Sequence, residues 1–174
     1  MKINRVWAMP DKYTFRIKPI AELLARYVDD GKGWIDPFAG KNSPAEITND
    51  LNPECPTMYH MKALDFLKGL DGVYNGVLFD PPYSLRQVKE CYESTGIRFM
   101  QYDSQNAIRW TDEKDEIARL IRPGGYAISF GWNSNGIGLL RGFQIKEILL
   151  IAHGAAHNDT IITVERQLQA KFHG

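Results

Sequence analysis

Short apolar runs alternate with amphipathic segments along this chain. Between residues 17 and 28 the apolar side chains recur at helical spacing, and the Asp-Asp-Gly of residues 29–31 follows, so a helix is predicted there. Two further helices are expected over residues 85–93 and 112–121. Short β-rich runs bounded by Gly, Pro, Asn or Asp predict strands at 34–36, 47–48, 57–59, 76–79 and 126–130. This alternation is typical of an α/β protein with a mostly parallel sheet.

The last part of the chain departs from this alternation. Residues 143–166 contain two β-rich runs around a turn rich in Gly, Asn and Asp, which predicts an antiparallel hairpin. The first crossover is also short: residues 39–46 separate the first two expected strands, whereas a parallel crossover usually needs roughly a dozen residues or more. The Ser-Pro-Ala-Glu of residues 43–46 resembles a capping box with proline at the first helical position, so a single helical turn is expected.

The chain has 174 residues, a normal size for one domain, and we expect a single domain over residues 1–174. Its 21 basic and 21 acidic residues cancel, so a nucleic acid would have to meet a local patch of charge. Cys55 and Cys91 have no paired spacing, as expected in a reducing compartment. Without an apolar signal segment or a membrane-spanning run, the sequence predicts a cytoplasmic protein.

Two of the predicted strands end in similar corners. The sequence reads WIDPFAG at residues 34–40 and VLFDPPY at residues 77–83. In an open parallel sheet, ligands bind beyond the carboxyl ends of the strands, so polar residues at this point are candidates for a site. Taken alone, a proline after an apolar run simply ends the strand. Both corners in this order, with RPGG at residues 122–125, make a more specific pattern.

These segments resemble the amino-methyltransferases that use S-adenosylmethionine to methylate exocyclic amines of DNA bases, and most closely their adenine-N6 branch. DPFAG at residues 36–40 is similar to the cofactor motif of that family, and DPPY at residues 80–83 matches its catalytic motif in full. LIRPGGYAISFGW, from residue 120, is similar to a helix, turn and strand of the wider methyltransferase fold. The resemblance covers most of the chain and implies a Rossmann-like class I methyltransferase fold, here with a shortened first crossover.

The resemblance implies S-adenosyl-L-methionine as the cofactor and assigns residues to it. TNDLNPE places the acid that binds the ribose on Asp50, and ALDFL places the adenine contacts on Asp65 and Phe66. FRIKPIAELL at residues 15–24 is similar to the helix whose beginning borders the methionine end. The cofactor-binding residues expected on this basis are Phe15, Lys18, Asp36, Pro37, Phe38, Ala39, Gly40, Asp50, Leu51, Asp65 and Phe66.

The chemistry of DPPY can be argued from its residues. An exocyclic amine of adenine is conjugated with the ring, so acceptors must hold its protons while the nitrogen attacks a methyl group. Asp80 and a backbone carbonyl can supply these acceptors, and the prolines fix their direction because proline restricts φ and has no N–H. A tyrosine can stack on a base that is flipped out of a duplex. The expected catalytic residues are Asp80, Pro81, Pro82 and Tyr83.

No metal site is expected. His153 and His157 have i, i+4 spacing, but no helix is predicted there and no acidic partner completes a zinc signature. Methyl transfer from a sulfonium depends on positioning and electrostatics, so neither a metal nor a nucleophilic side chain is required.

The first residue of the catalytic motif indicates the target. In the family that this sequence resembles, Asp at this position is typical of adenine-N6 enzymes. Ser is more often found there in cytosine-N4 enzymes, and Asn in enzymes that methylate glutamine side chains. Asp80 therefore favours methyl transfer to the N6 amine of adenine in DNA. Two alternatives stay open: an RNA base amino-methyltransferase of the ribosomal guanine-N2 type, whose fold also carries a DPP corner, and a catalytically inactive nucleic-acid-binding member of the fold.

The cofactor loop departs from the family pattern. Asn42 stands where family members usually have a second glycine, and asparagine tolerates positive φ better than most residues, so the turn can survive. Because the first crossover is short, we expect one wall of the cofactor pocket to be thin. We also expect the affinity for the cofactor to be weak or to depend on a partner.

Neither the interval between Asp65 and Asp80 nor the tail has room for a separate target-recognition domain, so we expect residues 84–110 to be the target-recognition insertion. Basic and aromatic side chains interleave in this segment, a pattern that can grip phosphates and stack bases. An ordinary amphipathic helix and a solvated loop have the same composition. The substrate-binding residues expected for DNA, or alternatively RNA, are Ser84, Arg86, Arg98 and Arg109, with Lys89, Tyr92, Phe99, Tyr102 and Trp110 among them.

Overall fold

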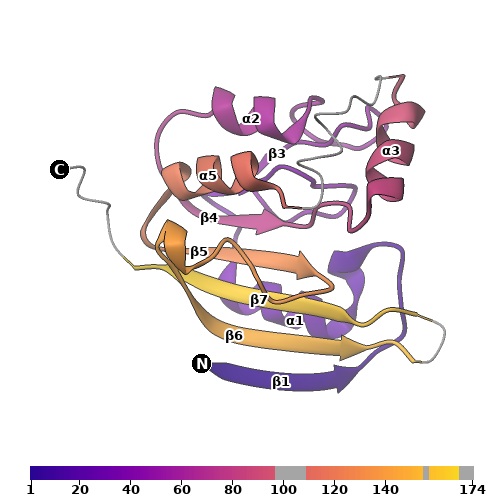
Figure 1. Cartoon of the computed structure of the whole chain (residues 1–174), viewed down its shortest axis with the longest axis vertical. Helices are drawn as coiled ribbons and strands as arrows, with labels where there is room; N and C mark the ends of the chain where they lie inside the picture. Colours follow the sequence, from indigo (N-terminus) through magenta and orange to yellow (C-terminus); the bar gives the residue numbers. More distant parts are fainter. Residues whose placement is uncertain (97–108, 155–156, 169–174) are drawn as a thin grey trace.

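The computed structural model describes residues 1–96, 109–154 and 157–168. In this part of the chain seven strands form one sheet, in the order β1-β6-β7-β5-β4-β2-β3 (Figure 1). The strands are β1 (Lys2–Trp7), β2 (Trp34–Asp36), β3 (Ile47–Thr48), β4 (Tyr74–Phe79), β5 (Ile121–Gly131), β6 (Phe143–Ala152) and β7 (Thr160–Gln167). The helices are α1 (Lys18–Tyr27), α2 (Ala63–Gly69), α3 (Leu85–Ser94) and α5 (Thr111–Leu120), with the 3₁₀ turns η1 (Thr14–Arg16) and η2 (Leu139–Arg141).

The directions of the strands follow the predicted α/β pattern. β3, β2, β4 and β5 are parallel neighbours, β7 runs antiparallel to β5 and β6, and β1 is parallel to β6. The mostly parallel sheet and the C-terminal antiparallel hairpin are therefore confirmed. Parallel pairing of Ile35 with Val77 sets the ends of β2 and β4 side by side, which brings the two Asp-Pro corners to one edge of the sheet.

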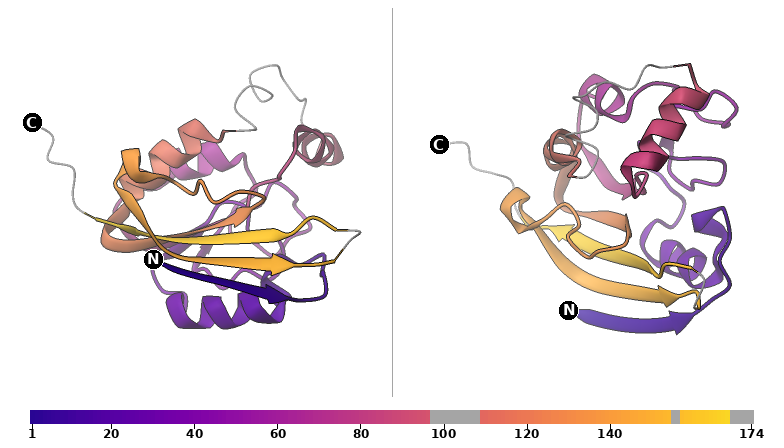
Figure 2. Two further views of the ribbon diagram at one scale, coloured as in Figure 1. Left: turned by 60° about the horizontal axis from the view of Figure 1, so that its bottom comes forward. Right: turned by 45° about the vertical axis from the view of Figure 1, so that its right-hand side comes forward.

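The two faces of the sheet bury separate sets of apolar side chains. Successive residues of a strand point to opposite faces, so Val77 and Phe79 of β4 pack in the core of α2 and α5, while Leu78 packs in the core of α1. Figure 2 shows α1 on one face of the sheet and α2, α3 and α5 on the other. Both faces are therefore covered at β4, as the strands of a parallel sheet require.

Gly76 of β4 allows the indole of Trp34, on the neighbouring strand β2, to approach its backbone closely. A Cβ atom at this position would lie 2.5 Å from the ring of Trp34, its partner in the parallel register. The indole of Trp34 is only 3% exposed, so it fills the space that a side chain at residue 76 would need. A glycine in a strand often marks such a close approach.

Most predicted elements overlap observed elements of the same kind, namely those at 17–28, 34–36, 47–48, 76–79, 85–93, 112–121 and 126–130. The strand expected at residues 57–59 is wrong, because only an isolated parallel bridge joins Tyr59 to Asn49. β1 and α2 are found in addition to the predicted elements.

The first crossover is short, as predicted, but it contains no helical turn. The hydroxyl of Ser43 donates a hydrogen bond to Asp36 at 2.6 Å, and the carboxylate of Glu46 accepts one from the backbone N–H of Gly33 at 2.6 Å. In a capping box, the acidic side chain would instead bind the backbone N–H of the serine. The capping box expected over residues 43–46 is therefore wrong, because Glu46 binds a partner outside the crossover.

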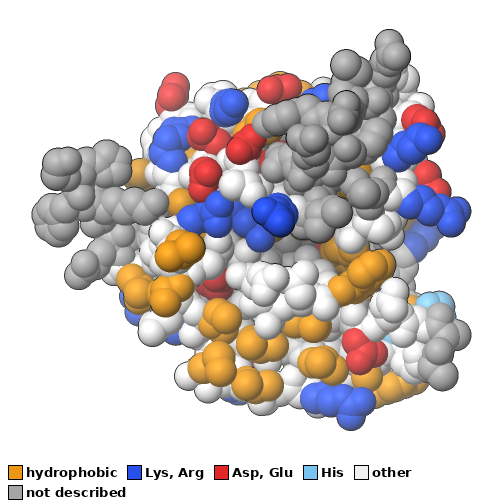
Figure 3. Space-filling model, in the orientation of Figure 1, with side chains coloured by type: hydrophobic (Ala, Val, Ile, Leu, Met, Phe, Trp, Pro, Cys, Tyr) orange, Lys and Arg blue, Asp and Glu red, His pale blue; other side chains and the backbone are white. Residues whose placement is uncertain are grey.

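One side of the sheet is apolar at its outer strands. Ile3 and Trp7 of β1 are 63% and 64% exposed, and Leu140 of η2 is 98% exposed. Figure 3 shows hydrophobic side chains gathered over the lower half of this face, where Figure 1 draws β7, β6 and β1. None of the described α-helices lies in front of these strands in Figure 1. Within the described ranges, no helix has the length and apolar character needed to cross a membrane.

Candidate active site

The Asp-Pro corners after β2 and β4 open onto one cavity of about 480 Å³. Residues from both corners line it, together with residues from α3 and from the segment between Asp50 and Asp65. A cavity of this volume lies within the usual range for small-ligand sites. All four residues of the second corner contribute to its wall, namely Asp80, Pro81, Pro82 and Tyr83.

A second hollow of about 120 Å³ adjoins the first. Thr14, Phe38 and Asp80 line both. The smaller hollow is also lined by the expected cofactor residues Phe15, Ala39 and Gly40. Asp80 therefore stands where the two hollows meet.

The carboxylate of Asp80 faces the hydroxyl of Tyr83. Tyr83 donates a hydrogen bond to Asp80 Oδ1. Burial raises the pKa of Asp80 above the usual carboxyl value, and hydrogen bonds from the side chains of Tyr83 and Thr14 oppose that rise. Burial and the nearby charge of Asp80 also raise the pKa of Tyr83. The phenol therefore keeps its proton and acts as the donor of this pair.

The helix that follows the second corner fixes the backbone of that corner. Gln87 of α3 accepts a hydrogen bond from the backbone N–H of Tyr83 at 2.7 Å. Ser84 accepts one from the backbone N–H of Gln87 at 3.3 Å and so caps the beginning of α3. Ser84, an expected substrate residue, is placed here as an N-cap outside the cavity wall.

Asp36 lies beneath the first corner and not in the wall of either hollow. Its carboxylate is fully buried and accepts hydrogen bonds from the hydroxyl of Ser43 at 2.6 Å and from the backbone N–H of Phe38 at 3.0 Å. Burial raises the pKa of Asp36 to about 7, and the charges of Asp80 and Asp50 act in the same direction. Asp36 thus shapes the corner, while Pro37 and Phe38 reach the larger cavity.

Asp50 connects the segment after β3 to the corner after β2. Its Oδ2 accepts a hydrogen bond from the backbone N–H of Gly40 at 2.8 Å, and its Oδ1 accepts one from the N–H of Asn52 at 2.8 Å. Asp50 and Leu51 both line the larger cavity. The expected ribose-binding acid is therefore held in place by two backbone groups.

Asn49 is a positioning residue that sequence reasoning missed. It is fully buried, and its side-chain amide donates to the carbonyls of Pro37 and Met61, each at 3.0 Å. Its side-chain oxygen accepts from the backbone N–H of Met61 at 3.1 Å. These bonds join the first corner to the segment that leads into α2.

The other expected cofactor residues lie in the walls of the hollows, in the core or on the exposed surface. Asp65 of α2 lines the larger cavity, whereas Phe66 is 2% exposed, packs in the core, and has its ring 5.6 Å from that of Tyr59. Phe15 lines the smaller hollow, with its ring 5.2 Å from that of Phe130. Lys18, the first residue of α1, is exposed and lines neither hollow.

Those of the expected basic substrate residues that the structure describes do not line the cavity. Arg86 pairs with Glu90 at 2.7 Å, and Lys89 pairs with Glu93 at 3.7 Å, both within α3. Arg109 is exposed just before α5. Arg98, with Phe99 and Tyr102, lies outside the described residues. The two cations of α3 are thus neutralised by glutamates one turn away.

The inner face of α3 forms a wall of the cavity, to which Tyr92 contributes as expected and three further residues contribute that sequence reasoning missed. Gln87, Val88, Cys91 and Tyr92 all line the cavity, and their i, i+1, i+4, i+5 spacing places them on one side of the helix. That spacing can be read from the sequence, but the sequence does not indicate that this side of the helix faces a cavity. Trp110, at the start of α5, completes this wall with its ring 5.1 Å from that of Phe38.

Acidic groups dominate the lining of the larger cavity among the described residues. The charged side chains in its wall are Asp50, Asp65, Asp80 and Glu113, with Lys62 as the cation. In a partly buried site such charges act over short distances in a lower dielectric than water. The cavity therefore favours a ligand with positive charge and disfavours a phosphate.

Within the described ranges, no group of three His, Cys, Asp or Glu side chains is arranged to hold a metal ion. His153 is buried, and its ring nitrogens lie 2.9 Å from the carbonyl oxygen of Ala8 and 2.8 Å from the hydroxyl of Thr160. His157 is exposed. His153 therefore ties the loop between β6 and β7 to the end of β1.

Comparison with known proteins gives structural matches alone. No protein-family model matches the chain, and no curated protein matches it. TrmN from Thermus thermophilus matches over 90% of this chain and 52% of its own, with 14% identity and a TM-score of 0.54. A conserved hypothetical protein of Streptococcus pyogenes matches over 90% and 96%, with 15% identity and a TM-score of 0.53.

The N-methyltransferase NodS from Bradyrhizobium japonicum matches over 87% of this chain and 96% of its own, with 9% identity and a TM-score of 0.56. The complex of NodS with S-adenosyl-L-homocysteine matches as well. The chain thus spans about half the length of the TrmN structure and nearly all of the other two. At such low identity these likenesses establish the fold, which is the expected Rossmann-like methyltransferase fold.

Proposed function

We propose that this protein is an S-adenosylmethionine-dependent methyltransferase that transfers a methyl group to the N6 amine of adenine in DNA. The observation that carries the proposal is the position of Asp80 in an intact Asp-Pro-Pro-Tyr corner, where the two hollows meet. A carboxylate there can reach both a cofactor in the hollows and an acceptor amine beside Tyr83.

The residues around the hollows fit S-adenosylmethionine in size and charge. The larger cavity would hold the adenosine part, with Asp50 as acceptor for the ribose and Asp65 near the base. The smaller hollow, lined by Phe15 and Gly40, would hold the methionine end. When bound, this cofactor supplies an electrophilic methyl group on a positively charged sulfur. The carboxylate of Asp80, which lines both hollows, suits that charge, and the fold is one in which NodS binds S-adenosyl-L-homocysteine.

Asp80 would act on the acceptor amine by accepting one of its N–H hydrogens. The burial that raises the pKa of Asp80 also makes its ionised form a strong hydrogen-bond acceptor. The amine would replace the hydroxyl of Tyr83 as donor to Asp80. Pro81 and Pro82 would hold a backbone carbonyl in a fixed direction for the second N–H, and the attacking nitrogen lone pair would then face the methyl group.

Tyr83 would hold the ring that carries the amine. Its side chain lines the cavity, and its backbone is fixed by the hydrogen bond to Gln87. A base in a duplex presents its amine to such a site only after it has been flipped out and stacked on an aromatic face. Asp as the first residue of the corner is the feature that favours adenine over the other amine targets.

Mass spectrometry of nucleosides tests this proposal. The protein would be incubated with isotope-labelled S-adenosylmethionine and with unmethylated DNA or RNA of mixed sequence, and each polymer would then be digested. Labelled N6-methyladenine in DNA is the expected result. Label found only in RNA guanine would replace DNA by RNA as the substrate. No label in either polymer, from protein that binds the cofactor in calorimetry, would contradict the proposed activity.

A further inference from the structure

Trp132 lies beside Tyr83 although the two residues belong to different strand ends. β4 and β5 are parallel neighbours with Phe79 opposite Ser129, so the chain leaves both strands at the same edge of the sheet. The rings of Tyr83 and Trp132 are 5.5 Å apart at an angle of 55°. Together they form an aromatic corner, and Tyr83 also contacts the carboxylate of Asp80.

Packing does not explain the position of the Trp132 side chain. It is 45% exposed, and neither apolar core of the described residues includes it. Trp34 and Trp110, by contrast, are 3% and 9% exposed and belong to those cores. A single exposed aromatic residue is common on protein surfaces, but this one contacts a residue of the proposed site.

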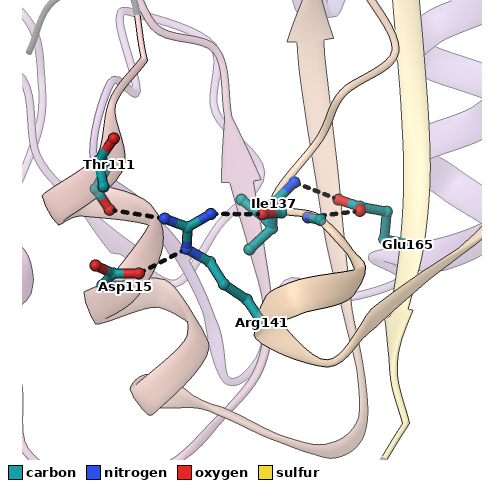
Figure 4. A network of polar contacts seen from close by, with 6 residues as sticks. Thr111, Asp115, Ile137, Arg141 and Glu165 are labelled. Atoms are coloured by element: carbon teal, nitrogen blue, oxygen red, sulfur yellow. Dashed lines mark hydrogen bonds and ion pairs between the residues drawn. The ribbon is translucent and has the colours of Figure 1, made fainter.

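The chain behind Trp132 is held firmly. Figure 4 shows Glu165 of β7 accepting hydrogen bonds from the backbone N–H groups of Ile137 and Gly138, at 2.6 and 3.0 Å. Arg141 donates to Asp115 of α5 at 2.6 Å and to the carbonyl of Ile137 at 3.3 Å. On the other side of Trp132, Gly131 pairs with Ile161 of β7. The indole therefore projects from a backbone that is held before Trp132 and again from residue 137 onward.

The aromatic corner is open on one side, because Trp132 is 45% exposed and Tyr83 lines the larger cavity. The indole itself can turn about two side-chain torsions without moving the anchored loop. A flat ring that stacks on Tyr83 would then meet the indole obliquely, an arrangement that aromatic pairs favour.

We infer that Trp132 and Tyr83 together bind the heteroaromatic ring that carries the acceptor amine, an inference that rests on the function proposed above. The substrate class follows from this pair: it is an amine attached to a planar heterocycle, such as a nucleobase. An aliphatic amine or a glutamine side chain has no aromatic face, so the indole would contribute nothing to its binding.

Equilibrium binding of single-stranded oligonucleotides tests the inference. The probes would carry either one 2-aminopurine or one abasic site, with S-adenosyl-L-homocysteine at saturation. We expect Trp132→Ala to weaken binding of the 2-aminopurine probe by roughly tenfold or more, since stacking of one base on an aromatic side chain has about this effect. Trp132→Phe keeps a ring and should retain most of the affinity. Leu140→Ala, which removes an exposed apolar side chain from η2, is the control and should bind as the wild type does.

Two outcomes would overturn the inference. One is a Trp132→Ala variant that binds the 2-aminopurine probe as tightly as the wild type. The other is a wild-type protein that binds the two probes equally. Methyl transfer measured on the same variants separates this inference from the proposed function. If Trp132→Ala transfers methyl groups at the normal rate, the role of the aromatic corner is refuted and the enzymatic activity stands. If binding depends on Trp132 but the wild-type protein transfers no methyl group, the enzymatic activity is refuted and the aromatic corner stands.

Discussion

The hydroxyl of Tyr83 donates a hydrogen bond to the carboxylate of Asp80 at the junction of the two hollows. This bond joins the first and last residues of the Asp-Pro-Pro-Tyr corner. It holds the aromatic ring next to the group that would accept the proton of an amine, and it opposes the rise in the pKa of Asp80 that burial causes. The corner therefore acts as one unit, and its members can be tested separately.

Replacement of Asp80 should abolish catalysis and spare cofactor binding. Asp80→Ala removes the acceptor for the amine, so turnover should fall by at least about a hundredfold, the usual effect of losing a general base or its equivalent. The dissociation constant for S-adenosylmethionine, measured by calorimetry, should change little. Asp71→Ala, which changes an exposed acid after α2, is the control. Near-normal turnover in Asp80→Ala would show that the carboxylate has no catalytic role.

Replacement of Tyr83 should change the pH dependence of the reaction. Asp80 must be ionised to accept a proton from the amine, so activity should be lost as the pH falls through its raised pKa. The Tyr83 hydrogen bond lowers that pKa, so Tyr83→Phe should raise it and shift the acid limb of kcat/KM to higher pH. Tyr74→Phe removes a hydroxyl that donates to the carbonyl of Asp71 and should leave the profile in place. If the acid limb of Tyr83→Phe is not shifted, the hydrogen bond from Tyr83 to Asp80 does not influence the pH dependence of kcat/KM.

Replacement of Asp50 should act mainly on the cofactor. Asp50→Ala removes an acceptor from the cavity wall and leaves the N–H groups of Gly40 and Asn52 without their partner. Because hydrogen bonds to charged groups are comparatively strong, affinity for S-adenosylmethionine should fall by roughly tenfold or more. Asp50→Asn keeps one oxygen acceptor and should lie between the wild type and the alanine variant. Calorimetry measures all three, and equal dissociation constants would rule out this role for Asp50.

Asp36 should make the folded state less stable as the pH rises. Burial raises its pKa to about 7 in the folded state, whereas in the unfolded chain it has the ordinary value of 3.8. Between these values the folded state binds the extra proton, so the contribution of Asp36 is largest in acid and is lost at up to about 1.4 kcal/mol per pH unit.

Asp36→Asn should remove this dependence, because an amide of the same shape does not titrate. Urea unfolding of both proteins between pH 4 and pH 7 gives the difference between their free energies of unfolding. That difference should shift in favour of the asparagine variant as the pH rises. A constant difference would mean that Asp36 is ionised in the folded protein throughout this range.

The close approach of the Trp34 indole to β4 predicts a stability effect at Gly76. Gly76→Ala would place a methyl group 2.5 Å from the ring of Trp34, and overpacking of this kind costs roughly 1–3 kcal/mol of unfolding free energy. Gly69→Ala, at the end of α2, meets no atom within 4 Å among the described residues and is the matched control. Thermal unfolding should show a lower Tm for Gly76→Ala alone. Equal Tm values for the two variants would show that the ring of Trp34 does not occupy the space beside residue 76.

The sequence was sufficient to predict the central strands because their signals are local. β2 and β4 are short apolar runs that end at proline, and proline cannot continue a ladder. β1 carries no such signal: its residues are exposed or half-buried, and its place depends on pairing with β6, far away in the chain. α2 is also weakly marked, because Lys62 at its beginning provides no side-chain cap.

The same distinction applies to the candidate site. The Asp-Pro corners are contiguous and can be recognised from their letters, whereas Asn49 matters only because its amide meets Pro37 and Met61. The inner face of α3 is predictable as a helix face, but the cavity beneath it depends on how the helix packs. Trp132 likewise becomes informative only once β4 and β5 are seen as neighbours.

The position of Asp80 at the junction of the two hollows has a consequence for the end of the proposed reaction. Methyl transfer would remove the positive charge from the sulfur, and the carboxylate of Asp80 would then face a neutral thioether. Its attraction for the spent molecule would be weaker than for a fresh one. The electrostatics that favour entry of the charged donor would thus also promote departure of the by-product.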